Sequence, residues 1–387
     1  MSLIYFDNSA TTKIDPQVLQ TYQTVANQFW GNPSSLHHLG DQALQMLQSA
    51  RQQIADLMHC QADEIFFTSG GTEGDNWVLK GTAMAKREFG RHLIVSSIEH
   101  PAVLNSAKQL EKLGWDVTYL PVDSHGYVHA ADVKKALRKD TVLVSVMGVN
   151  NEIGTVQPIQ EIAEVLQDRP TIHFHVDAVQ TVGKNLFDQV LPERVDFATF
   201  SGHKFHGPRG VGFVYIKKGR KLATLITGGG QERNWRNGTE NVPAIAAMSK
   251  AFRLVLTDET QKAAQQMAMR QKLLTALQAM PDITIFSPTT GPAAPHILCF
   301  ALSGVRGETM VHALEEHDIY LSTTSACSSR TGDESGTLKA MQVPEKLATS
   351  AVRISLDDQN TMAEVDQFLK VFPQVYQRFQ HMNGRVD

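Results

Sequence analysis

The chain has 387 residues, a length that predicts two domains rather than one small domain. Hydrophobic residues make up 42% and charged residues 20%, which is ordinary globular usage and argues against a disordered or fibrous protein. The formal net charge of -4 argues against broad electrostatic binding to nucleic acid or to an anionic membrane.

The first part of the chain begins with a helical pattern and continues with alternating strands and helices. An apolar stripe at helical spacing predicts a helix over residues 35–58. Strands are expected at 64–68, 92–97, 118–121, 142–149, 172–176, 195–200 and 211–216, with helices over 102–113, 130–138 and 159–166. This alternation is typical of βαβ units and predicts a mainly parallel sheet.

The remainder of the chain predicts a second, smaller α/β unit. A helix is expected over residues 261–280, a strand over 297–301 and another helix over 310–317. We therefore predict a large domain over 15–259 and a small domain over 260–387 that is joined by residues 1–14. Residues 322–336 are rich in Ser, Thr and Gly, which indicates a mobile loop.

The N-terminus, the apolar runs and the cysteine content give no indication of secretion or membrane insertion. The N-terminus lacks a basic segment followed by a long apolar stretch, and no apolar run is long enough to span a bilayer. The three cysteines, Cys60, Cys299 and Cys327, are too few and too scattered for a disulfide framework. We therefore expect a cytoplasmic protein with free thiols.

A glycine-rich segment separates the expected strand 64–68 from a helix. Parallel sheets bind their ligands beyond the carboxyl ends of the strands, and residues 68–72 (Thr-Ser-Gly-Gly-Thr) lie at such an end. Free N–H groups at a helix N-terminus can bind a phosphate there. The segment matches neither a Walker A loop nor a dinucleotide fingerprint, and a plain glycine-rich turn is the alternative.

A lysine follows the expected strand 195–200 in the sequence Ser-Gly-His-Lys. A shielded amine can lose its proton and attack a carbonyl, so Lys204 is a candidate Schiff-base lysine. Ser201 and His203 are placed to hold a phosphate. The alternative is an ordinary surface lysine.

Asp177 ends another expected strand, in the sequence His-Val-Asp. A carboxylate at this position can pair with a protonated pyridine nitrogen and make the ring a better electron sink. His173 and His175 share one face of the strand, so a metal pair is a rival interpretation. No further ligand spacing supports a metal, and we expect these histidines in the core or behind the site, with no metal bound.

Cys327 differs from the other two cysteines in its neighbours. It stands among small polar residues, where an exposed thiolate can act as a nucleophile, and an incidental surface thiol is the alternative. Cys299 stands among apolar residues and is expected in a buried strand. Cys60 is expected at the end of a helix.

These motifs together carry a resemblance to a known family. The sequence closely resembles the cysteine desulfurases of the NifS/IscS type, within the class-V aminotransferase group. The resemblance covers essentially the whole chain and rests on residues 7–12, 31–35, 67–73, 99–100, 149–154, 175–180, 201–204, 236–239 and 325–327.

The resemblance implies an activity, a cofactor and a fold. It implies a pyridoxal 5'-phosphate (PLP) enzyme that converts L-cysteine to L-alanine and holds the sulfur as a persulfide on Cys327. It also implies fold type I of the PLP-dependent transferases, with a seven-stranded, mainly parallel sheet in the large domain. Sulfur would pass to an acceptor protein of iron–sulfur cluster assembly or tRNA thiolation, and the protein would be a homodimer.

The resemblance also implies roles for individual residues. Cys327 would attack the substrate sulfur, Lys204 would bind the cofactor covalently and move protons, and His100 would stack on the cofactor ring. Asn151 and Arg353 would bind the substrate carboxylate. The residues implied to contact the cofactor are Gly71, Thr72, His100, Asn151, Asp177, Gln180, Ser201, His203, Lys204 and, from the partner subunit, Thr239.

Some positions depart from the pattern of the group. Gly74 stands where a serine is usual, and Trp77 where a small aliphatic residue is typical. The segment after Cys327 is more polar than expected, which leaves the sulfur acceptor open. Rival interpretations are a selenocysteine lyase, a cysteine-sulfinate desulfinase, a true aminotransferase or a non-catalytic protein on the same fold.

Overall fold

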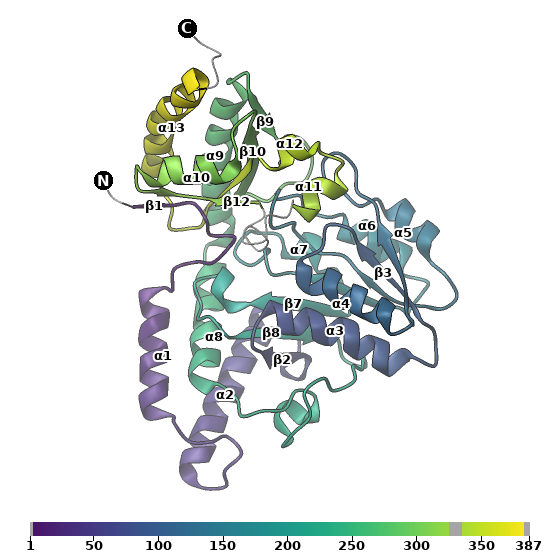
Figure 1. Ribbon diagram of the computed structural model, residues 1–387. Coiled ribbons are helices and arrows are strands. Elements are labelled where there is room, and N and C mark those ends of the chain that lie inside the picture. Colours follow the sequence, from purple (N-terminus) through teal and green to yellow (C-terminus); the bar gives the residue numbers. More distant parts are fainter. Residues whose placement is uncertain (1–2, 325–334, 383–387) are drawn as a thin grey trace.

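The structure is a computed structural model that describes residues 3–324 and 335–382. Two sheets with their own helices make up most of it (Figure 1). The larger sheet lies in the lower half of the view, and the smaller sheet lies with the C-terminal helix in the upper half. No described helix has the length and apolar character needed to cross a membrane.

A seven-stranded sheet forms the centre of the larger part. Its order is β2-β8-β7-β6-β5-β3-β4. Strand β8 is antiparallel to both neighbours, and every other adjacent pair is parallel, as the sequence predicted. The strands are β2 (Ile65–Thr68), β3 (His92–Ser96), β4 (Asp116–Leu120), β5 (Thr141–Ser145), β6 (His173–Asp177), β7 (Phe197–Ser201) and β8 (Gly212–Ile216).

Helices cover both faces of this sheet, which explains why its strands are almost continuously buried except at the edge strand β4. In β3, Leu93 and Val95 pack against α3 (Gly71–Lys86) and α4 (Pro101–Lys112). Ile94 points to the opposite face and joins the core that holds the other helices. Those helices are α5 (Ala130–Ala136), α6 (Ile159–Val165), α7 (Phe187–Val190) and α8 (Val242–Leu256).

Two N-terminal helices extend this core on the side of α8. Helices α1 (Pro16–Gln28) and α2 (His38–Leu57) both pack on α8 and stand beside it in Figure 1. Asp15 caps α1 by accepting a hydrogen bond from the Gln17 N–H. The structure confirms the predicted helix at 35–58 within a few residues, whereas α1 and α8 were not predicted.

The smaller sheet has the order β12-β13-β10-β9 and a separate hydrophobic core. In this core Phe300 packs edge-on against Phe372 of the C-terminal helix. The strands are β9 (Ile283–Ile285), β10 (Ile297–Leu302), β12 (Ser322–Thr323) and β13 (Ala351–Ser355). The helices are α9 (Glu259–Gln278), α10 (Gly307–Glu315), α11 (Gly336–Ala340), α12 (Glu345–Ala348) and α13 (Met362–Met382).

The N-terminus belongs to the smaller core. Strand β1 (Ile4–Tyr5) pairs in parallel with β11 (Ile319–Tyr320), and Phe6 packs edge-on against Phe368. The chain then crosses to the larger part on its way to α1 (Figure 1). The domain boundary at residues 259 and 260 stays a prediction.

Two expectations on element boundaries were wrong. The strand expected at 142–149 ends at Ser145, because the chain turns there into the cavity described below, and Val149 makes only an isolated bridge with Val156. Ser322 and Thr323, expected within the loop at 322–336, pair with β13 as β12. Residues 325–334 of the expected loop lie outside the described residues. Cys327 lies outside the described residues.

Candidate active site

A cavity of about 600 Å³ opens at the carboxyl ends of the parallel strands. Asp177 ends β6 and Ser201 ends β7, and both line it. The cavity brings together every predicted cofactor and substrate residue except Thr239, which is exposed and lies elsewhere on the same chain. These residues are Gly71, Thr72, His100, Asn151, Asp177, Gln180, Ser201, His203, Lys204 and Arg353.

The N-terminus of α3 forms one wall of the cavity. Its first residue is Gly71, preceded by Gly70 with φ 151°, and no side chain caps the helix. The first N–H groups of a helix have no partner within the helix, so this wall offers donors to an anion. A side chain at Gly71 would place its Cβ 2.9 Å from Val179 Cγ2, so only glycine keeps the wall open.

A charged pair stabilises this helix N-terminus. Glu73 accepts a hydrogen bond from the Ser69 N–H at 2.8 Å and is bound by two nitrogens of Arg236, at 2.7 and 3.0 Å. Although burial alone would raise it, these hydrogen bonds lower the pKa of the Glu73 carboxyl. Glu73 therefore stays ionised and fixes the loop that leads into the helix.

The departure at Gly74 has a structural reason. A Cβ at this position would lie 2.6 Å from Thr199 Cγ2 and 2.9 Å from Val214 Cγ2. Trp77, one turn further, is buried and donates a hydrogen bond from its indole N–H to the Ala223 carbonyl. Gly74 and Trp77 therefore allow α3 to pack closely against the sheet, and neither residue lines the cavity.

Lys204 follows β7 in a short 3-10 turn (Gly202–Lys204). Its Nζ donates to the Ser9 carbonyl at 2.6 Å and to the Ala10 carbonyl at 2.9 Å. The adjacent His203 shares a hydrogen bond with the Thr11 hydroxyl. The amine of Lys204 is thus held at the cavity by backbone from the N-terminal segment.

His203 and Ser201 stand on the same side of the cavity as the α3 N-terminus. Burial, and then the charges of Lys204 and Arg209, lower the pKa of His203 to about 4. The imidazole is therefore neutral at neutral pH. The Ser201 hydroxyl lies close to Gly70, because a Cβ added to Gly70 would stand 3.4 Å from Ser201 Oγ.

His100 and Asp177 form the central pair of the cavity. The Nδ1 of His100 accepts a hydrogen bond from the Ala102 N–H at 3.1 Å and so caps α4. Burial lowers the pKa of His100, with Asp177 acting against this and Lys204 adding to it. Burial raises the pKa of Asp177, whereas the His100 charge and the Val179 N–H lower it.

Two further buried acids stand behind Asp177. Glu99 accepts hydrogen bonds at Oε1 from the Ser96 hydroxyl at 2.6 Å and from the Met147 N–H at 2.7 Å, and burial raises its pKa to about 8. Burial and the charge of Asp177 raise the pKa of Asp75 well above its ordinary value. Asp75 Oδ1 and Glu99 Oε2 have no hydrogen-bond partner among the described residues.

The two histidines of β6 bind neighbouring hydroxyls. His173 shares a hydrogen bond with Thr82, and His175 with Ser145 and Thr199. Burial lowers the pKa of His175 to about 3, so its ring is neutral. Among the residues that the structure describes, no group of three metal-binding side chains occurs.

Arg353 stands in β13 and reaches the cavity from the smaller sheet. Its guanidinium donates to Asp7 at 2.9 Å and to the Asn151 carbonyl at 2.8 Å, while its Nε has no hydrogen-bond partner among the described residues. The side chain is only 3% exposed. A buried cationic donor of this kind suits a small carboxylate.

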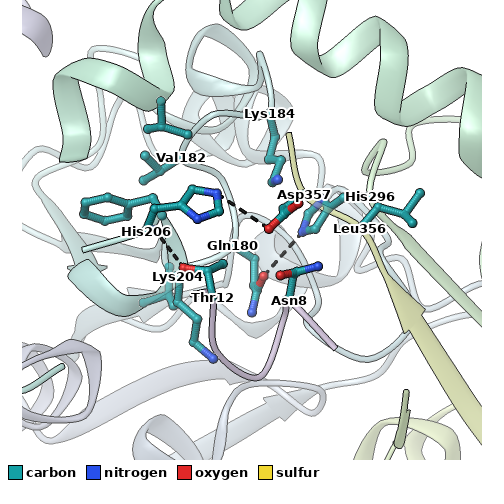
Figure 2. A pocket seen from close by; sticks show the side chains of 13 residues that line it. Asn8, Thr12, Gln180, Val182, Lys184, Lys204, His206, His296, Leu356 and Asp357 are labelled. Atoms are coloured by element: carbon teal, nitrogen blue, oxygen red, sulfur yellow. Dashed lines mark hydrogen bonds and ion pairs between the residues drawn. The ribbon is translucent and has the colours of Figure 1, made fainter. Parts of the chain in front are cut away.

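Gln180 also lines the cavity, and its side chain is already engaged. Its Nε2 donates to the Ser9 carbonyl at 3.0 Å, and its Oε1 lies 3.4 Å from His296 Nε2 (Figure 2). The contact again involves the segment that holds Lys204. Residues 9–11 were part of the resemblance, but no role was predicted for them; their only signal was the match itself.

The donor set fits PLP. An uncapped helix N-terminus with Ser201 and His203 suits a phosphate. A buried carboxylate at Asp177 suits a protonated ring nitrogen, and the amine of Lys204 faces the same cavity. Asp75, Arg209 and Thr324 line the site without having been predicted, because nothing in their local sequence distinguishes them. Glu99 was part of the resemblance, but no role was predicted for it.

The comparison with protein families agrees with this geometry. The sequence profile described as aminotransferase class-V matches residues 4–368. The chain belongs to the class-V aminotransferase family. It is therefore a PLP-dependent enzyme, as the motifs predicted.

Class-V relatives cover the chain almost completely. A "NifS/IcsS protein homolog" of Lactobacillus delbrueckii subsp. bulgaricus is 58% identical over 98% of this chain and 99% of its own length. "Cysteine desulfurase IscS" of Methanosarcina thermophila is 40% identical over 98% and 93% of the two chains. The predicted resemblance to the NifS/IscS type is confirmed.

Solved structures of class-V proteins share the fold. A "NifS-like protein" superposes with a TM-score of 0.91 at 39% identity, covering 97% of this chain and 99% of the other. A structure described as "SspA in complex with cysteine" has a TM-score of 0.79 at 32% identity, covering 92% and 100%. The predicted fold class is therefore confirmed.

Proposed function

We propose that this enzyme is a cysteine desulfurase that converts L-cysteine to L-alanine and keeps the sulfur as a persulfide on Cys327. The observation that carries the proposal is the cavity that joins the amine of Lys204, the buried carboxylate of Asp177 and the free Nε of Arg353. Relatives at 40% identity are named cysteine desulfurases, and a structural neighbour at 32% identity is described as bound to cysteine.

The residues around the cavity would divide the work of holding the cofactor. When bound, PLP supplies an electron sink for the substrate's α-carbon. The α3 N-terminus, with Thr72, Ser201 and His203, would hold its phosphate. Asp177 would keep the ring nitrogen protonated, and His100 would lie against the ring.

Substrate binding and proton transfer would fall to three other side chains. Arg353 would bind the substrate carboxylate through its free Nε, with Asn151 beside it. The Lys204 amine, which two carbonyls hold at the cavity, would remove the Cα proton and return it. Gln180 would contact the cofactor's phenolic oxygen.

The sulfur step would use a thiolate on Cys327. An S–S bond forms between Cys327 and the substrate sulfur while the substrate C–S bond breaks, and the electron pair of that bond stays on carbon, which takes up a proton. Thr324 lines the cavity, and Cys327 follows it by three residues, a reach of about 10 Å for extended chain. On the far side of residues 325–334, Ser335 donates a hydrogen bond to Glu152, next to Asn151.

The other two cysteines are unsuited to this step. Burial, with neighbouring carboxylates, raises the pKa of Cys60 to about 12. Cys299 is fully buried in β10, and burial raises its pKa well above the ordinary value. A thiol of raised pKa carries little thiolate at neutral pH and is a poor nucleophile.

The test replaces Cys327 by serine and measures both products. The wild-type enzyme with PLP and L-cysteine should form alanine and sulfide in equal amounts, with sulfide released only when a thiol reductant is present. Cys327→Ser should keep the visible colour of bound PLP and lose sulfide formation by about 10²-fold or more. Cys60→Ser is the matched control and should behave as wild type.

Either of two results would reject the proposal. Full sulfide formation by Cys327→Ser would show that Cys327 is not the nucleophile and would favour a lyase that needs no cysteine. A wild-type enzyme that binds PLP but forms neither product would point to a different substrate.

We further propose a homodimer that delivers sulfur to an acceptor protein. Thr239 is exposed and lies apart from the cavity of its own chain, which supports a role at the cofactor phosphate of a partner subunit. Light scattering of the PLP-bound enzyme tests the assembly, and a monomer that is fully active would contradict it. The acceptor, either an iron–sulfur scaffold or a tRNA-thiolation protein, and the cytoplasmic location stay predictions.

A further inference from the structure

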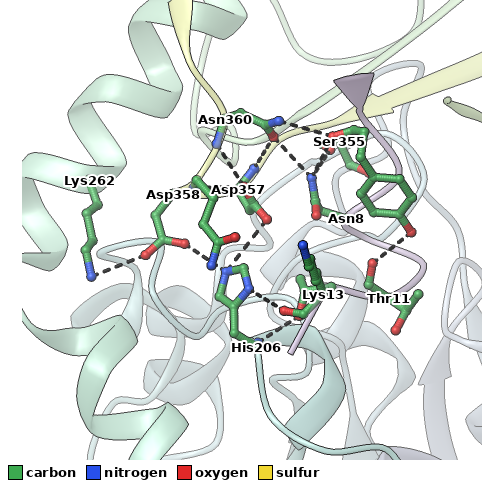
Figure 3. A network of polar contacts seen from close by, with 12 residues as sticks. Asn8, Thr11, Lys13, His206, Lys262, Ser355, Asp357, Asp358 and Asn360 are labelled. Carbon is green, nitrogen blue, oxygen red and sulfur yellow. Dashed lines mark hydrogen bonds and ion pairs between the residues drawn. The ribbon is translucent and has the colours of Figure 1, made fainter. Parts of the chain in front are cut away.

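A buried ionic contact lies on the opposite side of Lys204 from the cavity. His206 follows Lys204 by two residues and has φ 64°, a left-handed conformation that an L-residue adopts only at a cost. Its ring is directed to the turn that follows β13, where Asp357 and Asp358 lie (Figure 3). This turn belongs to the smaller core, so the contact joins the two halves of the fold.

The hydrogen bonds of His206 require a doubly protonated ring. Nδ1 lies 2.9 Å from the Lys13 carbonyl, which can only accept, so Nδ1 must donate. Nε2 lies 2.8 Å from Asp358 Oδ1. The other oxygen of Asp358 lies 3.2 Å from the Lys262 ammonium, which keeps the carboxylate ionised, so Nε2 must donate as well.

The charges around His206 favour this state. Asp357 Oδ2 stands 3.7 Å from Nε2, and the buried Lys184 lies close to Asp357 (Figure 2). Although burial alone would lower it, the two carboxylates raise the pKa of His206 above 6.5. Although burial alone would raise it, His206 and Lys262 hold the pKa of Asp358 well below its ordinary value.

The contact is linked to Lys204 through the N-terminal segment. The His206 N–H donates to the Thr12 hydroxyl at 2.7 Å, and that hydroxyl donates to the His203 carbonyl at 3.0 Å. The Thr12 N–H donates to the same carbonyl at 2.9 Å. Residues 9 and 10 of this segment supply the carbonyls that hold the Lys204 amine.

We propose that His206 is a positioning residue for Lys204, acting through its ion pair with Asp358 and its hydrogen bond to the Lys13 carbonyl. The pair fixes residues 203–206 and residues 9–13 against each other and against the turn of the smaller core. The amine of Lys204 then meets the cavity from a fixed direction. The inference rests on the proposed function only in taking Lys204 as the lysine that binds PLP.

The inference gives the position of Lys204 a pH dependence. The folded-state pKa of His206 is raised, so its stabilising contribution is complete below about 6.5 and is lost as the pH rises through the raised value. The stabilising contribution of Asp358 has the opposite pH dependence. Its pKa is lowered, so the contribution is lost only in strong acid, as the pH falls below 3.8. The ion pair between His206 and Asp358 is therefore intact from mildly acid pH up to the raised pKa of His206, and it is lost above that pKa.

The experiment compares His206→Gln and Asp358→Asn with wild type as PLP-bound enzymes. The readout is the visible absorbance of the lysine-bound cofactor as a function of pH, together with kcat and KM for L-cysteine. Both variants should shift the absorbance midpoint by about half a pH unit or more and lower kcat by about 10-fold, with KM little changed. Asp358→Asn serves if His206→Gln does not fold, because it keeps the ring and the Lys13 contact.

The matched control is His312→Gln, which removes an exposed histidine that pairs with Glu315 at 3.3 Å. It should leave the absorbance titration and kcat unchanged. Variants at His206 and Asp358 that lower only the thermal midpoint, with the titration and kcat of wild type, would overturn the inference and leave a structural role.

A separate measurement tests whether Lys204 is the lysine that binds PLP. Borohydride reduction of the wild-type enzyme, followed by peptide mass analysis, should find PLP on Lys204. Its absence there would reject the proposed function and the inference together. Its presence with unshifted variants would reject the inference alone.

Discussion

The two regions on either side of Lys204 differ in whether their buried polar atoms have hydrogen-bond partners. On the cavity side, Arg353 and Asp75 line the cavity, and Arg353 Nε and Asp75 Oδ1 have no hydrogen-bond partner among the described residues. On the other side, both ring nitrogens of His206 and both oxygens of Asp358 are engaged. An unsatisfied buried polar group costs about 1–3 kcal/mol, and a ligand in the cavity would remove that cost for Arg353 and Asp75.

The engaged side has its own small exception, which supports the same point. Asn8 Oδ1, His296 Nδ1 and Gln266 Nε2 lack partners there, and Asn8 and His296 line a cavity of about 10 Å³ (Figure 2). That space suits a single water molecule. The large cavity has room for the proposed substrate and cofactor, whereas the small one has room only for water.

The largest expected effect comes from removing the amine between the two regions. Lys204→Ala should lower alanine formation by about 10³-fold or more, because in the proposed mechanism it removes both the covalent attachment of PLP and the base at the substrate Cα. Single-turnover measurement of alanine with PLP in excess checks this. Retention of a tenth of the wild-type rate would show that another group moves the proton.

A smaller effect is expected from replacing Arg353, whose Nε lacks a hydrogen-bond partner among the described residues, by a different cationic residue. Arg353→Lys keeps a positive charge near Asp7 but lacks the free Nε. A hydrogen bond between charged groups contributes about 1.5–3 kcal/mol, so KM for L-cysteine should rise about 10- to 100-fold.

Asp7→Asn is the matched control for this substitution, because it removes the ion pair and leaves the guanidinium in place. It should change KM by less than Arg353→Lys does. Equal KM values for wild type and Arg353→Lys would place the carboxylate-binding residue elsewhere.

The smallest expected effect is on stability as a function of pH. Glu99 has a pKa raised from 4.5 to about 8 by burial, so the folded protein holds a proton there that the unfolded chain has released. Between these values stability should fall as the pH rises, by about 1.4 kcal/mol per pH unit for one proton. Glu99→Gln should flatten this slope, because an amide can still accept the Ser96 and Met147 hydrogen bonds.

Calorimetric Tm values of the PLP-bound enzyme between pH 5 and 8 test this expectation. Exposed carboxylates such as Glu315 provide the control, since Glu315→Gln should leave the slope unchanged. A Glu99→Gln enzyme with the wild-type slope would show that Glu99 is ionised in the fold.

The sequence predicted the site better than it predicted the helices around it. Strand ends could be located, and parallel strands gather their carboxyl ends at one edge, so Asp177, Ser201 and Lys204 were expected together. Helix α8 was not predicted because almost every face of it is buried and it has no apolar stripe. Helix α1 buries only Val18 and Val25, too few to produce a clear period.

Contacts between distant segments were beyond the reach of sequence patterns. His206 and Asp358 are 152 positions apart, and neither has a local motif that marks its partner. The carbonyls that hold Lys204 belong to Ser9 and Ala10, whose side chains give no indication of that role. Backbone acceptors of this kind become visible only in a folded structure.

The N-terminal strand also has a consequence for how the protein is made. Ile4 and Tyr5 pair with Ile319 and Tyr320, and the Asn8 N–H donates to the Ser355 carbonyl. A ribosome synthesises the first of these segments long before the others exist, so residues 4–12 must wait without their partners while the large sheet forms. Lys204 can therefore reach its final position only when the last tenth of the chain has emerged from the ribosome. The time at which PLP absorbance appears during synthesis would show when this happens.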